Sequence, residues 1–166
     1  MNGKVCACAG LEPNDLPFGS DETDKRCILL KKRLCRCLKD LIVQGGVRHF
    51  ISDMTRGFGT LFMETALALR DEMYPQITVE AALPYETQAE DWSEAQRDRY
   101  FALVERCDTE TMLQTAYTPQ SAERCARYLV ERCDYLVAVR AGSGEQAIVR
   151  RARQCGKTVR YVGTEE

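Results

Sequence analysis

Cysteine is the residue with the greatest capacity for chemistry in this chain, which contains nine cysteines and one histidine. Two close pairs, Cys6/Cys8 and Cys35/Cys37, could each supply half of a metal site. On a strand, Cys6 and Cys8 would face the same side, whereas on a helix Cys35 and Cys37 would point in different directions. The chain has no Cys-x-x-Cys, and an odd number of cysteines cannot form a closed disulfide set. We therefore predict buried structural thiols and no metal site.

Acid–base chemistry has few candidates. His49, the only histidine, lies in the apolar run Val47–Ser52 and not in a loop beside a nucleophile, so we interpret it as a half-buried strand residue. Glu64 is placed one turn inside an expected helix that follows a glycine-containing loop. It is the one candidate for a catalytic residue, and it could face either a pocket or solvent.

Glycine-containing loops could instead hold a ligand. Four loops follow expected strands, and in a parallel sheet the ligand lies beyond the carboxyl ends of the strands. These loops are Gly10–Gly19, Asp53–Gly59, Pro84–Trp92 and Ala141–Gly144. The second and the fourth lead into expected helix N-termini, where free N–H groups and the helix dipole favour a phosphate. The same glycines could equally serve only to close tight turns, because no established phosphate-binding motif is present.

The predicted ligand-binding residues come from these four loops. They are Gly10, Glu12, Asp53, Arg56, Gly57, Gln88, Trp92, Gly142, Ser143 and Gly144. Gln88 and Trp92 could bond or stack on a base, although we slightly favour a core position for Trp92.

The elements that would position these loops alternate between strand and helix. Apolar runs predict strands at 5–9, 47–52, 77–83, 111–114, 135–139 and 158–162. Helical spacing and capping signals predict helices at 23–43, 60–73, 93–106 and 119–132, and a last helix that ends at Gly156. Capping boxes are expected at Ser93/Gln96 and Ser143/Gln146, and Thr118 with Pro119 is expected to begin a helix. Near-continuously apolar strands are typical of a parallel sheet that is covered on both faces. We predict an α/β fold in which residues 1–166 form a single Rossmann-like domain, with a mainly parallel sheet and helices on both faces.

Bulk properties exclude several classes of protein. A net charge of −2 provides no global field that would attract nucleic acid, and no apolar stretch is long enough to span a membrane. The N-terminus lacks an apolar signal core. We expect a cytoplasmic protein with no membrane association, and nucleic acid is not an expected partner.

The loops occur in an order that resembles the YpsA-like family. The matching segments read Leu-Pro-Phe-Gly-x-Asp-Glu at 16–22, Phe-Ile-Ser-x-Met at 50–54 and Ala-Leu-Pro-x-x-x-Gln-x-x-x-Trp at 82–92, with further matches at 99–100, 128–134, 136–139 and 156–157. The family belongs to the SLOG superfamily, together with the DNA-processing DprA proteins and the cytokinin-activating LOG phosphoribohydrolases. The resemblance implies a Rossmann-like domain whose pocket holds a nucleotide or a nucleotide-derived ligand.

The departures from the family pattern concern the pocket. Glu12 replaces a cation of a Gly-His-Arg-Pro motif, Asp53 stands where glycine is usual, Gly59 stands where aspartate is usual, and Glu145 stands in a Gly-Gly-Thr turn. Each added carboxylate would cost a phosphate ligand on the order of 1 kcal/mol or more. Arg56 and Arg140 could restore some positive charge.

Two explanations of these departures remain open: a pocket that has decayed and is kept for protein contacts, or one retuned to a less anionic ligand. The leading hypothesis is a ligand-binding or regulatory domain without a cofactor and without strong catalysis, whose partner is a nucleotide-like small molecule. The alternatives are a nucleotide-processing enzyme, such as an N-glycosidic hydrolase like the LOG relatives, a protein-interaction scaffold, and a DNA-binding module. A homo-oligomer or a protein partner is compatible with each of them.

Overall fold

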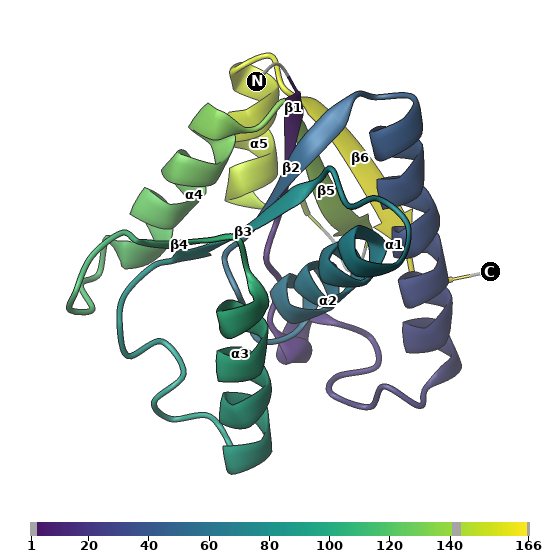
Figure 1. The fold of residues 1–166 in the computed structure, drawn as a ribbon. Coiled ribbons are helices and arrows are strands. Elements are labelled where there is room, and N and C mark those ends of the chain that lie inside the picture. Colours follow the sequence, from purple (N-terminus) through teal and green to yellow (C-terminus); the bar gives the residue numbers. More distant parts are fainter. Residues whose placement is uncertain (1–2, 141–143, 166) are drawn as a thin grey trace.

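The computed structural model describes residues 3–140 and 144–165, and its centre is a six-stranded sheet in which all paired strands are parallel (Figure 1). The strands are β1 (Lys4–Cys8), β2 (Val47–Ser52), β3 (Thr78–Leu83), β4 (Thr109–Met112), β5 (Tyr135–Arg140) and β6 (Thr158–Gly163). Their order across the sheet is β4-β3-β2-β1-β5-β6. This arrangement confirms the predicted α/β class and the Rossmann-like parallel sheet.

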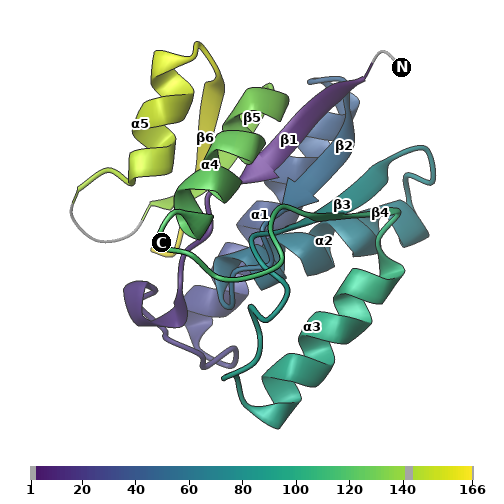
Figure 2. The same ribbon diagram turned by 90° about the vertical axis from the view of Figure 1, so that its left-hand side faces the viewer.

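Helices cover both faces of the sheet, as Figures 1 and 2 show from two directions. Helices α1 (Lys25–Val43), α2 (Phe58–Glu72) and α3 (Glu94–Arg106) share one hydrophobic core with the sheet. Helices α4 (Ser121–Arg132) and α5 (Ala147–Gln154) share the core on the other face. The strands serve both cores by alternation, since Cys6 and Cys8 enter the first core and Ala7 and Ala9 enter the second. No described helix is long and apolar enough to cross a membrane.

The strand order reverses beside β1, and this reversal determines where a ligand site can form. The chain proceeds outward from β1 through β2 and β3 to β4, whereas β5 pairs with the other edge of β1 and β6 lies outside it. The connections that leave β1 and β5 therefore diverge above the carboxyl ends of neighbouring strands. In open α/β sheets this divergence creates the ligand-binding crevice.

Helices α1 and α2 each begin two residues from their expected starts at 23 and 60, and two starts that were predicted from capping signals also differ. Helix α4 begins at Ser121 and not at Pro119, because Thr118 N donates to Ser121 Oγ at 2.9 Å and Ser121 N donates to Thr118 O at 3.0 Å. These bonds form a separate turn before the helix. Helix α5 begins at Ala147, so Gln146 is its N-cap residue and not the third residue of a capping box. Ser143, the other member of that expected box, lies outside the described residues. The box at Ser93/Gln96 is confirmed.

His49 belongs to a buried polar network on the α4 side of the sheet. Its Nδ1 is 2.6 Å from Thr78 Oγ1 and its Nε2 is 2.7 Å from Glu80 Oε1, which confirms a half-buried strand histidine. Glu80 also accepts hydrogen bonds from Thr111 Oγ1, at 2.8 Å, and from the Tyr128 hydroxyl. Burial alone would raise the pKa of Glu80, but the hydrogen bonds from His49, Tyr128 and Thr111 outweigh it and lower that pKa to about 2.

Candidate functional site

A cleft of about 1210 Å³ opens at the carboxyl edge of the sheet, where the strand order reverses. Its walls are the loops after β1, β2, β3 and β4, the described part of the loop after β5, and parts of α4 and α5. Seven predicted ligand-binding residues line it: Gly10, Glu12, Asp53, Arg56, Gln88, Trp92 and Gly144. Gly57 lines a smaller adjoining pocket of about 150 Å³, to which Arg56 and Trp92 also contribute. The predicted residues Gly142 and Ser143, like the first part of the loop from Ala141, lie outside the described residues.

Gly10 and Asp53 form the base of the cleft and fit each other closely. A Cβ atom at Gly10 would collide with Asp53 Oδ2 and with Thr55 Oγ1, so glycine is required while these side chains are present. The carboxylate of Asp53 also accepts a hydrogen bond from Thr55 N at 2.9 Å. Burial raises the pKa of Asp53 above its usual range. The aspartate that replaces the family's glycine is therefore an integral part of the turn after β2.

Arg56 is the cation nearest to this base, and its charge is already shared. Its Nη2 is 3.4 Å from Glu12 Oε1, and its guanidinium carbon lies 5.6 Å from the centroid of the Trp92 ring. Its Nε is buried without a hydrogen-bond partner among the described residues. Partial burial raises the pKa of Glu12, and Arg56 offsets part of that effect. Arg56 therefore compensates for Glu12 and adds little net positive charge to the cleft.

The N-terminus of α2 is closed by the protein's own carbonyl groups. Phe58 N donates to Leu11 O at 3.0 Å, and Thr60 N donates to Thr55 O at 3.0 Å. Gly57 allows this closure because its φ of 114° is in a region that L side chains rarely adopt, and a Cβ there would collide with Leu11 O. These two N–H groups are unavailable to a phosphate, which favours the turn-closing alternative for the second glycine loop.

Gln88 and Gln146 hold the cleft together. Gln88 Nε2 donates to Asp53 O at 3.1 Å, while Gln88 Oε1 accepts from the Tyr100 hydroxyl at 3.3 Å. Both ends of the Gln88 amide are thus engaged within the protein. Gln146 Nε2 donates to Gly10 O at 2.9 Å and ties the start of α5 to the loop after β1. The sequence provided only a capping interpretation for Gln146, because this bond joins residues that are distant in the chain.

The aromatic wall of the cleft includes two tyrosines that the sequence analysis missed. Tyr85 and Tyr117 make an edge-to-face contact, with 5.2 Å between ring centroids, and both line the cleft. Tyr117 is 64% exposed. Trp92 is partly buried, packs edge-to-face on Tyr100 with 5.3 Å between ring centroids, and lines the cleft, so it belongs both to the core and to the cleft wall. The rule that selected the four loops could also have found Tyr117, because Tyr117 lies in the loop after the fourth predicted strand.

The α4 and α5 side of the cleft is polar and largely neutralised. Arg151 Nη2 is 3.3 Å from Glu123 Oε1, and both residues line the cleft. Glu145 also lines it, but its carboxylate pairs with Arg153. Arg140 is not among the lining residues, because its guanidinium lies 4.3 Å from the centroid of the Tyr161 ring.

Glu64 is not brought to the cleft. It accepts two hydrogen bonds from Arg99, at 2.8 and 2.6 Å, and lines a separate hollow of about 300 Å³ between α1 and α2. Arg99 also donates to Glu22 at 2.5 Å. Hydrogen bonds from Arg99 and Lys31 lower the pKa of Glu22 to about 2, despite its partial burial. This network joins the segment before α1 to α2 and α3.

Eight of the nine cysteines lie in or against the two cores, whereas Cys155 is exposed, contrary to the prediction of buried thiols. Cys6 and Cys8 point to the same side of β1, as expected, and both are fully buried. Within residues 3–140 and 144–165, no three His, Cys, Asp or Glu side chains form a group that could hold a metal ion.

Comparison with known proteins places these loops in a family. The model of the YpsA SLOG family matches residues 6–147, which include every described loop of the cleft and end at the first residue of α5. The chain belongs to the YpsA SLOG family. Similar proteins include a UPF0398 protein of Bacillus velezensis and another of Bacillus licheniformis. Each is 28% identical over 136 residues, which cover 81% of this chain and 73% of the relative. Family membership confirms the resemblance seen in the loop sequences.

Proposed function

We propose that this YpsA-family chain is a ligand-binding or regulatory domain whose cleft takes a nucleotide-derived molecule with a ring system and little negative charge. The observation that supports this most strongly is the combination of aromatic rings and carboxylates in one large cleft at the reversal of strand order. Its position is the usual ligand site of open parallel sheets.

The aromatic residues suit a planar ring. Trp92 lies on one part of the cleft wall, and the pair Tyr85 and Tyr117 lies on another. Stacking of a base on an aromatic side chain contributes about 1–3 kcal/mol per base. The exposed ring of Tyr117 is available for such a contact, whereas the Trp92 ring is held by Tyr100 and Arg56.

The charged residues disfavour a polyphosphate. Glu12, Asp15, Asp53 and Glu123 line the cleft, while the lining cations Arg56 and Arg151 are each paired with one of these acids. A phosphate close to one unpaired carboxylate would lose on the order of 1 kcal/mol or more. Part of the helix N-terminal positive potential is also unavailable, because carbonyl groups accept from the N–H groups of Phe58 and Thr60 in the first turn of α2. This pattern supports a retuned pocket over a decayed one, since the replacements are bonded into the wall.

Asp53 is the best-placed acid for an enzymatic function such as N-glycosidic hydrolysis, because it is more buried than Glu12, the other cleft acid whose pKa is raised. Glu64 is engaged by Arg99 outside the cleft, whereas Asp53 lines the cleft and has a raised pKa, as a general acid requires. Release of free base from a nucleoside monophosphate, followed by chromatography, tests this alternative. Activity that Asp53→Asn abolishes without unfolding the protein would establish the enzyme in place of the binding domain.

Trp92 provides a direct test of binding because it is the only tryptophan in the chain and lines the cleft. Titration with adenosine, guanosine and their mono- and diphosphates is followed by Trp92 fluorescence and repeated by calorimetry. We expect the nucleosides to bind more tightly than their phosphates. The dissociation constants of the phosphates should be in the high-micromolar range or weaker, which corresponds to a binding free energy of about −5 to −6 kcal/mol.

The matched variants are Tyr117→Ala, which removes an exposed ring of the cleft, and Phe101→Ala, which removes an exposed ring outside it. The first should weaken binding about tenfold and the second should leave it unchanged. Low-micromolar binding of a diphosphate, or a Trp92 signal that none of these compounds changes, contradicts the proposal.

A further inference from the structure

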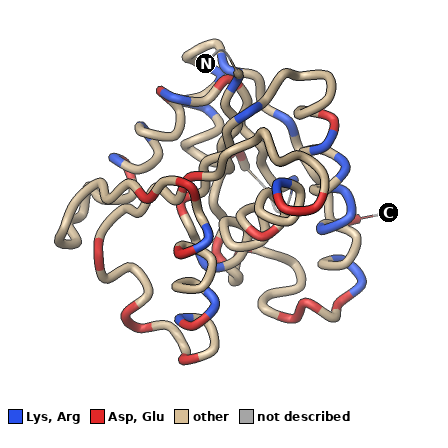
Figure 3. Tube along the Cα trace, viewed as in Figure 1, with Lys and Arg blue, Asp and Glu red and all other residues tan. Residues whose placement is uncertain are grey.

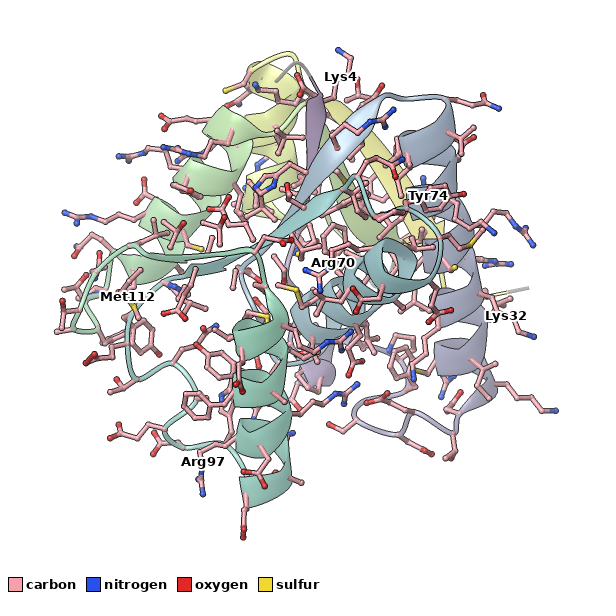
Figure 4. All side chains as sticks on the ribbon, in the orientation of Figure 1. Lys4, Lys32, Arg70, Tyr74, Arg97 and Met112 are labelled. Carbon is pink, nitrogen blue, oxygen red and sulfur yellow. The ribbon has the colours of Figure 1, made fainter. Side chains whose placement is uncertain are left out.

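Positive charge is concentrated on α1. This helix contains seven Lys or Arg residues and one Asp within 19 residues, although the whole chain has a net charge of −2. Figure 3 shows the basic residues following the length of α1, with acidic residues distributed over other parts of the molecule. The labelled side chain of Lys32 extends away from the body of the protein (Figure 4).

The solvent side of α1 presents a basic stripe, defined as Lys25, Ile28, Lys32 and Arg36. These residues are spaced three or four apart, are all exposed, and lie opposite the buried leucines of the helix. Ile28 is 43% exposed and places one apolar side chain among these cations.

The solvent side of α3 presents an acidic stripe, defined as Glu94, Asp98, Phe101 and Glu105. These residues have the same helical spacing and are also all exposed. Phe101 is 60% exposed, and its ring contacts Tyr100 at 5.1 Å between centroids. Each stripe thus combines three charges of one sign with one exposed apolar residue.

The charged members of both stripes have no partner within the described part of the chain. None of their side chains makes a hydrogen bond or an ion pair there, whereas neighbouring residues of the same helices do, for example Lys31 with Glu22 and Arg106 with Asp71. Lys25 is the first residue of α1 and Glu105 lies in the last turn of α3, so each charge is unfavourable to the dipole of its own helix. Helix stability therefore does not explain these two residues.

The two stripes match in length and order when the helices run antiparallel. Each stripe spans eleven residue steps, which corresponds to about 16 Å of helix. In this register the facing pairs are Lys25 with Glu105, Ile28 with Phe101, Lys32 with Asp98, and Arg36 with Glu94. Every cation faces a carboxylate, the two apolar residues face each other, and antiparallel helix dipoles attract.

We propose that the basic stripe of one copy of this chain docks antiparallel on the acidic stripe of a second copy. The contact cannot form within one molecule, because α2 packs between α1 and α3 and contacts both of them (Figure 1). The contact is heterologous, so each pair of molecules leaves one basic and one acidic stripe free for further copies. A single pair of helices buries a small interface, and we expect a dissociation constant on the order of 100 μM that rises with salt.

Sedimentation velocity over a range of protein concentrations tests the proposal. Wild type should show a sedimentation coefficient that increases with concentration at low salt, and about 0.5 M salt should remove most of this increase. Reversal of one stripe, by Lys32→Glu with Arg36→Glu or by Glu94→Lys with Asp98→Lys, should weaken self-association at least about tenfold.

Combining the two reversals tests complementarity rather than charge alone. The variant with all four substitutions carries inverted stripes and should associate as wild type does. A mixture of the two single-stripe variants should associate as wild type does, although each variant alone should associate at least about tenfold more weakly. Lys4→Glu with Arg124→Glu is the matched control, because both residues are exposed and lie outside the stripes. This variant should associate as wild type does.

Three outcomes would overturn the proposal. Wild type could remain monomeric at all concentrations. The four-substitution variant could fail to associate while circular dichroism shows that it is folded. Duplex DNA could increase the sedimentation coefficient of wild type, and only the reversal on α1 could abolish this increase. That result would assign the basic stripe to a polyanion instead of a second copy.

Discussion

The buried carboxylate of Glu80 should make stability depend on pH in a predictable way. Its side chain is only 7% exposed, and hydrogen bonds lower its pKa from 4.5 to about 2. A carboxyl whose pKa is lowered by folding stabilises the protein above its unfolded pKa and loses this contribution as pH falls through the folded pKa. The pKa shift corresponds to a contribution of about 3 kcal/mol to the free energy of unfolding at pH 7, and about 2 kcal/mol of this contribution should be lost by pH 3.

Replacement of this carboxylate by its neutral isostere isolates that contribution. Glu80→Gln should be about 3 kcal/mol less stable than wild type at pH 7, and the difference should narrow to about 1 kcal/mol at pH 3, because protonated glutamate resembles glutamine. Urea unfolding at several pH values, followed by far-UV circular dichroism, measures the difference directly. Glu131→Gln, at an exposed position, is the control and should show no such trend. An equal cost for Glu80→Gln at pH 7 and pH 3 would refute the reasoning.

Three further predictions concern the remaining architecture. Gly57→Ala should lower the free energy of unfolding in urea by about 2–3 kcal/mol, because residue 57 has a positive φ and its new Cβ would collide with a carbonyl oxygen. Gly19→Ala, at a positive φ with open space around it, should lower it by about 1 kcal/mol. Equal costs would contradict the packing described for Gly57. Arg99→Gln should cost about 1–2 kcal/mol in the same assay, since it leaves Glu22 and Glu64 without their main donor, and an unchanged stability would contradict that role. Elemental analysis of protein purified without chelator should find zinc and iron well below one equivalent, and near-stoichiometric metal would contradict the assignment of the cysteines to the cores.

The sheet could be predicted from the sequence because parallel strands are buried on both faces and therefore appear as short apolar runs. The run around Val137 shows this most clearly, and β5 lies within the sheet between β1 and β6. The start of α4 could not be predicted by the same means. A proline after a threonine is a good local signal for a helix start, but Ser121 is buried and is held by Thr118 and by Gln114, which is seven residues away.

The location of the candidate cleft could be predicted from the sequence, but the contacts of its individual side chains could not. The rule that ligands bind at the carboxyl ends of strands brought Gly10, Asp53 and Trp92 to one cleft, as the structure shows. The rotation of a helix against its neighbours is not encoded in local sequence, and it determines that Glu64 faces Arg99 and not the cleft. The bond from Gln88 to the backbone of Asp53 likewise depends on contacts between distant segments.

We propose that the cleft prefers a ligand with little negative charge because carboxylates stand in place of a phosphate site. Calorimetry of AMP and ADP binding at two salt concentrations tests it most directly, with wild type and with the double variant Leu11→His and Glu12→Arg, which restores the family's Gly-His-Arg-Pro motif at 10–13. We expect high-micromolar or weaker binding by wild type and a gain of at least about tenfold, or 1.4 kcal/mol, in the variant, with a salt dependence that wild type lacks. Glu131→Arg, which makes the same charge change at an exposed position outside the cleft, should give no gain. Low-micromolar binding of either nucleotide by wild type, or a folded variant that gains nothing, would contradict the account.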